Sequence, residues 1–288
     1  MLGGAVTTAL RARGTEVLRL VRGEERDAPD AVWWNPAESQ VDEKAFAGVD
    51  AVLNFSGRPI DERWTETVKQ EIRQSRVKPT RLLAETIARL DPRPHTMLVS
   101  SGVNYYGDRD GEVLEETSAR GHGFLADVAV AWEAAADPAR EAGVRVVNTR
   151  FGAVMAEEGG ALARMLPIFK LGAGGTLGDG RQWFSWVALE DVVRAVLWLL
   201  DHPEIEGGVN VTSPNPVTNA AYTEALGNVL HRPTIARVPE FALKLAFGEL
   251  AEDVLLASQR VVPRRLLDAG FTFEHPEIEP ALRHILKS

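Results

Sequence analysis

The chain has 288 residues, 45% of them hydrophobic, a length that suits one large domain or a main domain with a small lobe. The 32 basic and 41 acidic residues give a formal net charge of −9 without any basic run, which disfavours nucleic acids and membranes as partners. Cysteine is absent and the six histidines show no metal-ligand spacing, so we expect no disulfide and no metal site. With no signal peptide and no apolar run near ~20 residues, the expected location is cytoplasmic.

The opening of the chain is the second half of a βαβ nucleotide-binding unit. Residues 2–13 form an amphipathic pattern typical of a helix, which Gly14 ends. A strand is predicted at 16–21, and the basic Arg22 follows it. The strand and glycine turn that begin such a unit are missing from the sequence.

Strands and helices alternate up to residue 150, which predicts a doubly wound parallel sheet with helices on both faces. Within the long helical pattern at 62–90, Pro79 predicts a kink or two separate helices. The predicted strands are 31–35, 50–57, 97–99 and 144–150, and the other predicted helices are 42–46 and 124–142.

The stretch from His95 to Gly107 organises this sheet. Met97 to Val99 reads as a buried strand that ends in Ser100 and Ser101, and Tyr105 and Tyr106 follow shortly after it. Ligands of such folds bind outside the carboxyl ends of the strands, so these hydroxyls are candidates for binding a substrate and moving protons. The alternative is an ordinary strand end closed by turn residues.

From residue 151 the pattern loosens. Glycines punctuate a loop around a helix at 161–171, and Gln182 to Trp186 then places three aromatic rings in five residues. These rings form either a flat-faced pocket or a core seam. Helices at 189–201 and 218–230 follow, with Asp191 expected to cap the first, and a strand at 208–211 lies between them. We place the sheet domain at 1–235 and a small, mainly helical lobe at 236–288, with helices at 241–247, 251–258 and 279–286.

Four stretches carry a family resemblance when taken together: 100–107, 149–154, 171–182 and 186–191. The chain resembles the epimerase-like branch of the extended short-chain dehydrogenase/reductase superfamily, often labelled nucleoside-diphosphate-sugar epimerase and historically cell-division inhibitor. The tail is similar to the C-terminal domain of that branch. The resemblance implies a Rossmann-like fold that binds a nicotinamide dinucleotide.

The family pattern begins with a strand and a glycine turn, of which Met1 to Gly3 matches only the last three positions. A start codon placed too far downstream and a true truncation both explain this, and we favour the former. A missing central strand leaves an unpaired sheet edge, so we expect the 288 residues alone to be poorly stable and to bind a dinucleotide weakly.

NADP is the expected cofactor, because a basic residue at the end of the second strand suits a 2′-phosphate. That residue is Arg22, whose alternative is an ordinary solvated arginine. The remaining cofactor-binding residues implied by the resemblance are Leu2, Gly3, Phe55, Ser56, Gly57, Ser100, Phe151 and Gly152. Those implied for a small-molecule substrate are Arg63, Arg76, Gln182 and Trp186, although each arginine suits a surface salt bridge equally well.

The usual catalytic residues of the superfamily are absent. Counting from the matching motifs, its tyrosine and lysine positions fall on Leu125 and Ala129, and its serine position falls on Gly102. The predicted catalytic residues are therefore Ser101, which would orient a carbonyl, and Tyr105 or Tyr106, one of which would donate the proton. Two hypotheses remain: an atypical NADP-dependent oxidoreductase or epimerase acting on a small or nucleotide-linked substrate, and a non-catalytic NADP-binding sensor or partner-binding protein.

Overall fold

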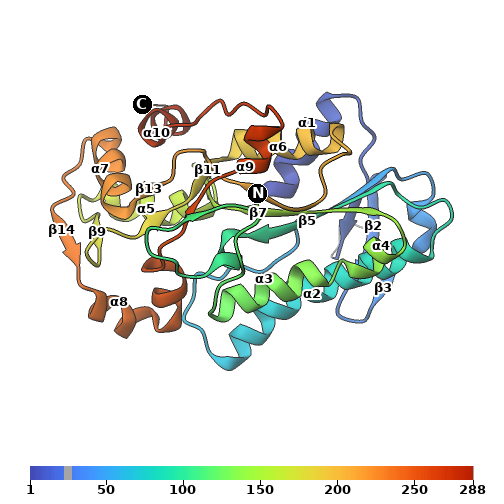
Figure 1. The fold of residues 1–288 in the computed structure, drawn as a ribbon, viewed down its shortest axis with the longest axis horizontal. Coiled ribbons are helices and arrows are strands. Elements are labelled where there is room, and N and C mark those ends of the chain that lie inside the picture. The colour runs from blue at the N-terminus through green and yellow to red at the C-terminus, as the bar shows by residue number, and fades with distance from the viewer. Residues whose placement is uncertain (23–27, 288) are drawn as a thin grey trace.

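A four-stranded parallel sheet lies at the centre of the computed structural model, which describes residues 1–22 and 28–287 (Figure 1). Its strand order is β12 (Gly207–Val211), β7 (Arg145–Phe151), β5 (Thr96–Gly102) and β4 (Ala51–Asn54). The apolar run of β5 is fully buried, because helices cover both faces of the sheet. The predicted doubly wound parallel sheet is therefore confirmed.

A smaller sheet holds β1 (Arg19–Val21), β2 (Ala31–Asn35) and β3 (Gln40–Val41). β1 and β2 are parallel, and β3 returns antiparallel to β2. Among the described residues no ladder joins β1 to β4, so the two sheets are separate. An unpaired strand edge is what the sequence predicts here.

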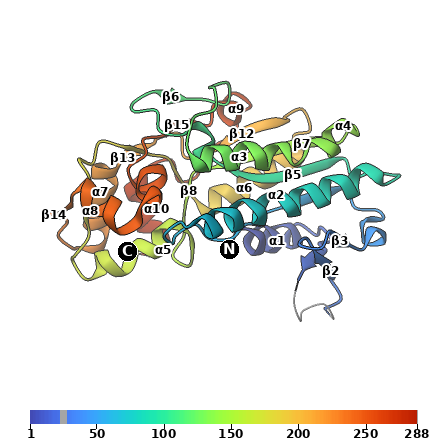
Figure 2. The same ribbon diagram turned by 90° about the horizontal axis from the view of Figure 1, so that it is seen from below.

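The helices form one layer on each face of the sheet (Figure 1). α1 (Leu2–Ala12) and α6 (Leu189–Asp201) cover one face, where Val6, Leu98 and Val196 share a core. α2 (Glu66–Arg89), α3 (Phe124–Ala134) and α4 (Asp137–Glu141) cover the other, where Leu83 and Val99 belong to a second core. Figure 2 shows α2 and α3 running side by side along this second face.

A proline lies within two of the predicted helical segments, and it divides only one of them. α2 is one helix of 24 residues that passes through Pro79, so the two-helix alternative is wrong. Its first turn is capped by the Thr65 hydroxyl, which accepts from the Val68 amide at 3.2 Å. The single helix expected at 124–142 is instead split into α3 and α4, since Pro138 lacks an amide donor and fits only the first turn of a new helix.

The tail is tied to the sheet domain by added strands. β14 (Ala236–Val238) pairs with β9 (Gly175–Leu177), and β15 (Arg260–Val261) pairs with β6 (Val113–Leu114). The helix expected at 251–258 is a single π turn at Ala251–Leu255, named η4. The other tail helices are α8 (Glu240–Phe247), α9 (Arg264–Asp268) and α10 (Ile278–Ile285).

Asp191 also attaches the tail, although it was expected to cap its own helix. Its carboxylate is fully buried and accepts from the amides of Glu274 and His275 at 2.8 and 2.9 Å. Arg194 pairs with the same carboxylate at 2.9 Å, which balances its charge.

The remaining elements complete the fold. No helix within the described residues is long and apolar enough to cross a membrane. These elements are η2 (Glu43–Phe46), η3 (Val103–Tyr106), β8 (Ala153–Met155), α5 (Gly160–Lys170), β10 (Trp183–Phe184), β11 (Trp186–Ala188), β13 (Val217–Thr218) and α7 (Asn219–Leu230).

Candidate functional site

The carboxyl ends of β4 and β5 bring most of the predicted site residues to one edge of the sheet. Asn54 pairs with Val99 at the last step of the ladder, so the residues that follow each strand, Phe55 to Gly57 and Ser100 to Ser101, come to the same edge of the sheet. The N-terminus of α1 reaches the same edge from the other face, because a Cβ on Gly3 would lie 4.0 Å from Cδ2 of Phe55.

Side chains alternate across this edge, so its two faces differ. Phe55 packs with the core on the α1 face, and Ser100 follows Leu98 onto that face. Ser56 and Ser101 point to the α2 and α3 face, where Ser101 meets Glu133. Ser100 is 4% exposed, and its buried hydroxyl has no hydrogen-bond partner among the described residues, which is unusual for a buried polar group.

A buried ion pair stands behind Ser101. The Ser101 hydroxyl donates to Oε1 of Glu133 at 2.8 Å. Arg150, at the end of β7, donates to both oxygens of Glu133 at 2.8 and 2.9 Å. Burial alone would lower the pKa of Arg150, but the Glu133 carboxylate outweighs it and raises that pKa, so Arg150 stays a cation. The Ser101 hydroxyl is therefore held in place by the Glu133 carboxylate, whose negative charge is already matched by Arg150.

The two tyrosines have different surroundings. Tyr106 is fully buried; its hydroxyl donates to Asn210 Oδ1 at 2.7 Å and accepts from Arg150 at 3.0 Å. Burial raises the pKa of Tyr106 to about 12. Tyr105 is partly exposed, and the guanidinium carbon of Arg150 lies 3.5 Å from its ring centroid. Of the two tyrosines, Tyr106 is buried, whereas Tyr105 keeps part of its surface exposed.

The position where the superfamily carries its tyrosine is filled by an apolar cluster. Leu125 is 6% exposed and packs with Trp64, Ile72 and Leu250. The tail contributes Asp253 next to this cluster. The Oδ2 atom of Asp253 accepts from the Leu125 amide at 3.1 Å, at the start of α3. Burial raises the pKa of Asp253 despite this contact with the helix amides.

The predicted cofactor residues fall into an accessible and a buried group. Arg22 and Gly57 are exposed, and Arg22 has no ion-pair partner within the described part of the chain. Phe151 is 8% exposed and belongs to the core. A Cβ on Gly152 would lie 2.8 Å from the Ser185 carbonyl oxygen, so this glycine permits close packing of two strands. The cofactor roles of these residues stay predictions.

Most of the predicted substrate stretch 182–186 forms a seam with the tail, although Gln182 also lines a hollow between the glycine loop and the tail. Trp186 is fully buried, and its indole donates to the Asn215 carbonyl at 3.2 Å. Gln182 donates to the Leu255 carbonyl of the tail at 3.0 Å. Arg63 likewise donates to a tail carbonyl, that of Leu245, at 3.1 Å. These contacts favour the core-seam interpretation over the pocket interpretation.

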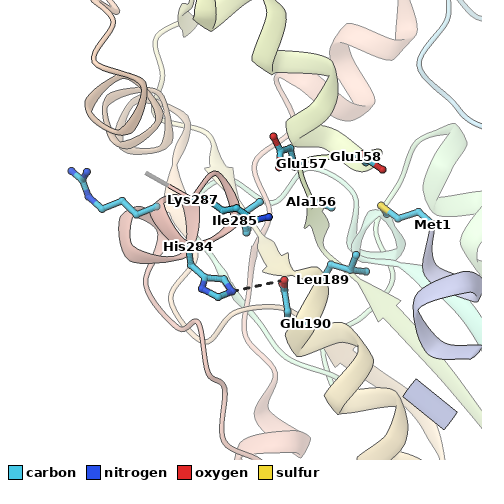
Figure 3. A pocket seen from close by; sticks show the side chains of 10 residues that line it. Met1, Ala156, Glu157, Glu158, Leu189, Glu190, His284, Ile285 and Lys287 are labelled. Carbon is cyan, nitrogen blue, oxygen red and sulfur yellow. Dashed lines mark ion pairs between the residues drawn. The ribbon is translucent and has the colours of Figure 1, made fainter. Parts of the chain in front are cut away.

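A hollow beside the N-terminus of α1 lies outside the β5 edge (Figure 3). It is bounded by the first residues of α1 and α6, the loop after β8 and the end of α10. His284 and Glu190 face each other in it at 3.9 Å. Its charged lining residues are Glu157, Glu158, Glu190, Arg283, His284 and Lys287, and none of the predicted catalytic residues belongs to it.

Comparison with known proteins agrees with this architecture. Residues 1–212 match the NAD dependent epimerase/dehydratase family, and residues 238–285 match a domain of unknown function, DUF1731. The chain belongs to the NAD dependent epimerase/dehydratase family. It is 43% identical over 283 residues to an epimerase family protein of Mycobacterium bovis, covering 98% of this chain and 93% of that protein.

Solved structures of this family share the fold. The human epimerase family protein SDR39U1, solved with NADPH, has a TM-score of 0.88 and 30% identity, covering 100% of this chain and 96% of that one. The Thermus thermophilus UDP-glucose 4-epimerase, solved with NAD, has a TM-score of 0.72 at 18% identity and covers 100% and 96%, which shows the fold alone. The expected resemblance to the epimerase-like branch is thereby confirmed.

Sequence reasoning missed Glu133, Arg150 and Asp253. A signal existed for Arg150, because a charged residue at the end of an otherwise apolar, buried strand requires a partner. The partner itself is found only in three dimensions, since Glu133 lies on a helix 17 residues earlier. Asp253 comes from the tail, 128 residues after the amide it contacts.

Proposed function

We propose that this family member binds NADP and acts as an atypical oxidoreductase or epimerase on a small or nucleotide-linked substrate. The observation that carries the proposal is the partly exposed phenol of Tyr105, held under the Arg150 guanidinium at the carboxyl end of β5. The cytoplasmic location stays part of the proposal.

The residues at the α1 face fit a dinucleotide. The buried, unpartnered hydroxyl of Ser100 lies on this face, and the N-terminus of α1 presents free amides next to Phe55. The exposed Arg22 suits a 2′-phosphate. NADPH bound to the human relative supports the choice of cofactor. When bound, the nicotinamide would supply or accept hydride.

The chain's own residues would then handle the proton. Tyr105 donates it to a carbonyl oxygen, and the Arg150 charge over its ring stabilises the negative charge left on the phenol oxygen. Ser101 is fixed by Glu133 and orients the substrate. Tyr106 holds Arg150 in position and does not touch the substrate.

Cofactor preference is the first test. Calorimetric titration of NADPH and NADH is the measurement, and NADPH should bind at least about tenfold more tightly than NADH, a difference of about 1.4 kcal/mol. Arg22→Ala should remove the difference, because the 2′-phosphate loses its cation. Equal affinities in the parent protein would contradict the NADP assignment.

The second candidate is a non-catalytic NADP-binding protein. The observation that favours it is the apolar cluster around Leu125, which occupies the usual position of the catalytic tyrosine. Screening NADPH oxidation against carbonyl compounds and nucleotide sugars separates the two candidates. If a substrate is found and Tyr105→Phe abolishes turnover while Tyr106→Phe retains it, the enzyme proposal holds. If Tyr105→Phe keeps full turnover, the phenol mechanism fails.

A further inference from the structure

Gln259, in the tail just before β15, carries a buried amide nitrogen without a hydrogen-bond partner. The residue is 8% exposed, and its Nε2 atom donates to no carbonyl and no side chain among the described residues. An unpaired buried donor costs free energy, so the few that occur in folded proteins call for an explanation. No contact within the described part of the chain supplies one.

The backbone around Gln259 is fixed, so the segment does not move to give the side chain a partner. The Gln259 amide donates to the Trp183 carbonyl at 3.0 Å, and the Gln259 carbonyl accepts from the Ser185 hydroxyl at 2.6 Å. Before it, the Ser258 hydroxyl accepts from the Trp183 amide at 3.0 Å. After it, the Val261 amide donates to the Ser185 hydroxyl at 2.9 Å. A rigid segment therefore holds the unpaired amide in place.

Ser185 brings Gln259 to the carboxyl edge of the central sheet. The Ser185 carbonyl accepts from the Ala153 amide at 2.8 Å, and its oxygen would lie 2.8 Å from a Cβ on Gly152. Gly152 follows Phe151, the last residue of β7, and β7 is the direct neighbour of β5. Ligands of doubly wound folds bind outside this edge. The unpaired amide thus lies where a ligand is expected.

The alternation of side chains along this segment decides the side to which Gln259 points. Arg260 lies over the ring of Trp183, with its guanidinium carbon 4.2 Å from the ring centroid. Val261 is fully buried against η3, the turn that carries Tyr105. Because residues two apart in an extended segment face the same side, Gln259 points to the side of η3.

We propose that Gln259 is a further substrate-binding residue, whose Nε2 donates a hydrogen bond to the same substrate oxygen that receives the proton of Tyr105. This inference rests on the proposed function for the role of Tyr105, and it narrows the substrate to a carbonyl compound whose oxygen lies between η3 and the tail. Gln259 keeps both of its amide hydrogens, so it binds the oxygen without taking part in the proton transfer. Two fixed donors aimed at one oxygen stabilise the negative charge that develops on it.

The test is a titration of the whole chain with acetone, a small carbonyl probe, followed by ¹H–¹⁵N NMR with and without NADPH. We expect a saturable shift of the Gln259 side-chain amide signals, because Nε2 gains an acceptor. Gln259→Met keeps the length of the side chain and removes the donor. It should weaken acetone binding about three- to tenfold, which is the loss of one neutral hydrogen bond.

Asn148→Leu is the matched control for this titration. Asn148 is also a buried amide with an unpartnered atom among the described residues, but it lies in the middle of β7, away from the carboxyl edge. Its replacement should leave acetone binding unchanged.

Urea unfolding separates a ligand-binding role of Gln259 from a structural one. Gln259→Met removes an unpaired buried donor, so the unfolding midpoint should stay the same or rise. A lower midpoint would mean that the fold itself uses the amide. If Gln259→Met does not fold, Gln259→Leu repeats both measurements.

Three results would overturn the proposal: no shift of the Gln259 side-chain amide, an unchanged acetone affinity in Gln259→Met, or a lower unfolding midpoint of that variant. NADPH titration of the same samples keeps the two ideas apart. An acetone response at Gln259 without NADPH binding removes the proposed function alone. NADPH binding with an acetone response at Tyr105 but none at Gln259 removes only this inference.

Discussion

The carboxyl ends of β4 and β5 lie side by side, and an arginine from a neighbouring element lies beside each: Arg150 of β7 beside β5, and Arg76 of α2 beside the residues that follow β4. Only the charge of Arg150 is neutralised by a carboxylate among the described residues. At β5 the charge of Arg150 is matched by Glu133 with two hydrogen bonds. At β4 the charge of Arg76 meets only carbonyls and a hydroxyl. An arginine whose charge is matched by a carboxylate stabilises the fold. An arginine at an open edge that has no carboxylate partner is available to bind a ligand. Removing the partner of Arg150 and removing Arg76 should therefore change the free energy of unfolding by different amounts.

The largest effect should come from breaking the balanced pair. Glu133→Leu leaves Arg150 as a buried, uncompensated cation and should destabilise the protein by about 3–5 kcal/mol. Arg76→Met removes a cation that has no counter-ion, so it should cost less than half as much. Urea unfolding monitored by tryptophan fluorescence measures both. Equal losses would mean that the two arginines do not differ in the way that we infer.

The tyrosines give the next largest effect. Tyr106→Phe removes a hydroxyl that bonds both Arg150 and Asn210, and it should cost about 1–3 kcal/mol because those buried groups lose a partner. Tyr105→Phe should change stability by less than about 0.5 kcal/mol, since no buried group depends on its hydroxyl. Thermal unfolding of the two variants measures the difference. A larger loss for Tyr105→Phe would reverse our assignment of the structural and the accessible phenol.

A smaller and pH-dependent effect is expected at the contact between the tail and α3. Because the folded-state pKa of Asp253 is raised by burial, its contribution to stability is fully present below the unfolded pKa and is lost as the pH rises through the raised value. Asp253→Asn keeps an oxygen that can accept from Leu125 and does not ionise. The difference in stability between variant and parent should therefore grow in favour of the variant from pH 4 upward. Urea unfolding at several pH values tests this, and a difference that shrinks with rising pH would contradict it.

The smallest effect should come from Gly57→Ala. The new methyl would lie 3.3 Å from the Arg76 guanidinium carbon, so the side chain must shift slightly. Stability should change by less than about 1 kcal/mol, since Gly57 is exposed and its backbone conformation accepts alanine. NADPH affinity should fall a few-fold in a calorimetric titration, because Gly57 is one of the predicted cofactor residues. An unchanged affinity would place the cofactor away from this glycine.

The fold was predictable because its signals are local. The buried run at Met97 to Val99 and the helix at Leu189 to Asp201 are strong patterns over many residues, and both elements lie where they were expected. The break between α3 and α4 was missed although Pro138 is visible in the sequence. Apolar residues continue on both sides of that proline, and their periodicity outweighed it in the prediction.

The site was less predictable because its contacts are non-local. Asp191 reads as a helix cap from its position, and only the folded chain brings the amides of Glu274 and His275 to it. Trp186 reads equally well as pocket or core, because an aromatic ring does not reveal which side of it is covered. Family resemblance placed Arg76 near the edge, but its lack of a carboxylate partner is a property of the packed structure.

The short ladder between β6 and β15 has a consequence for how the chain is made. It joins residues 113–114 to residues 260–261, so about 150 residues must be synthesised before the second strand exists. At ribosomal speeds of roughly 5–20 residues per second, the first strand waits for about 7 to 30 seconds. The sheet domain can assemble during that interval, because its long-range pairs close by residue 211. The tail therefore closes after the sheet, and the surroundings of Leu125 are completed only once residues 250–253 have been synthesised.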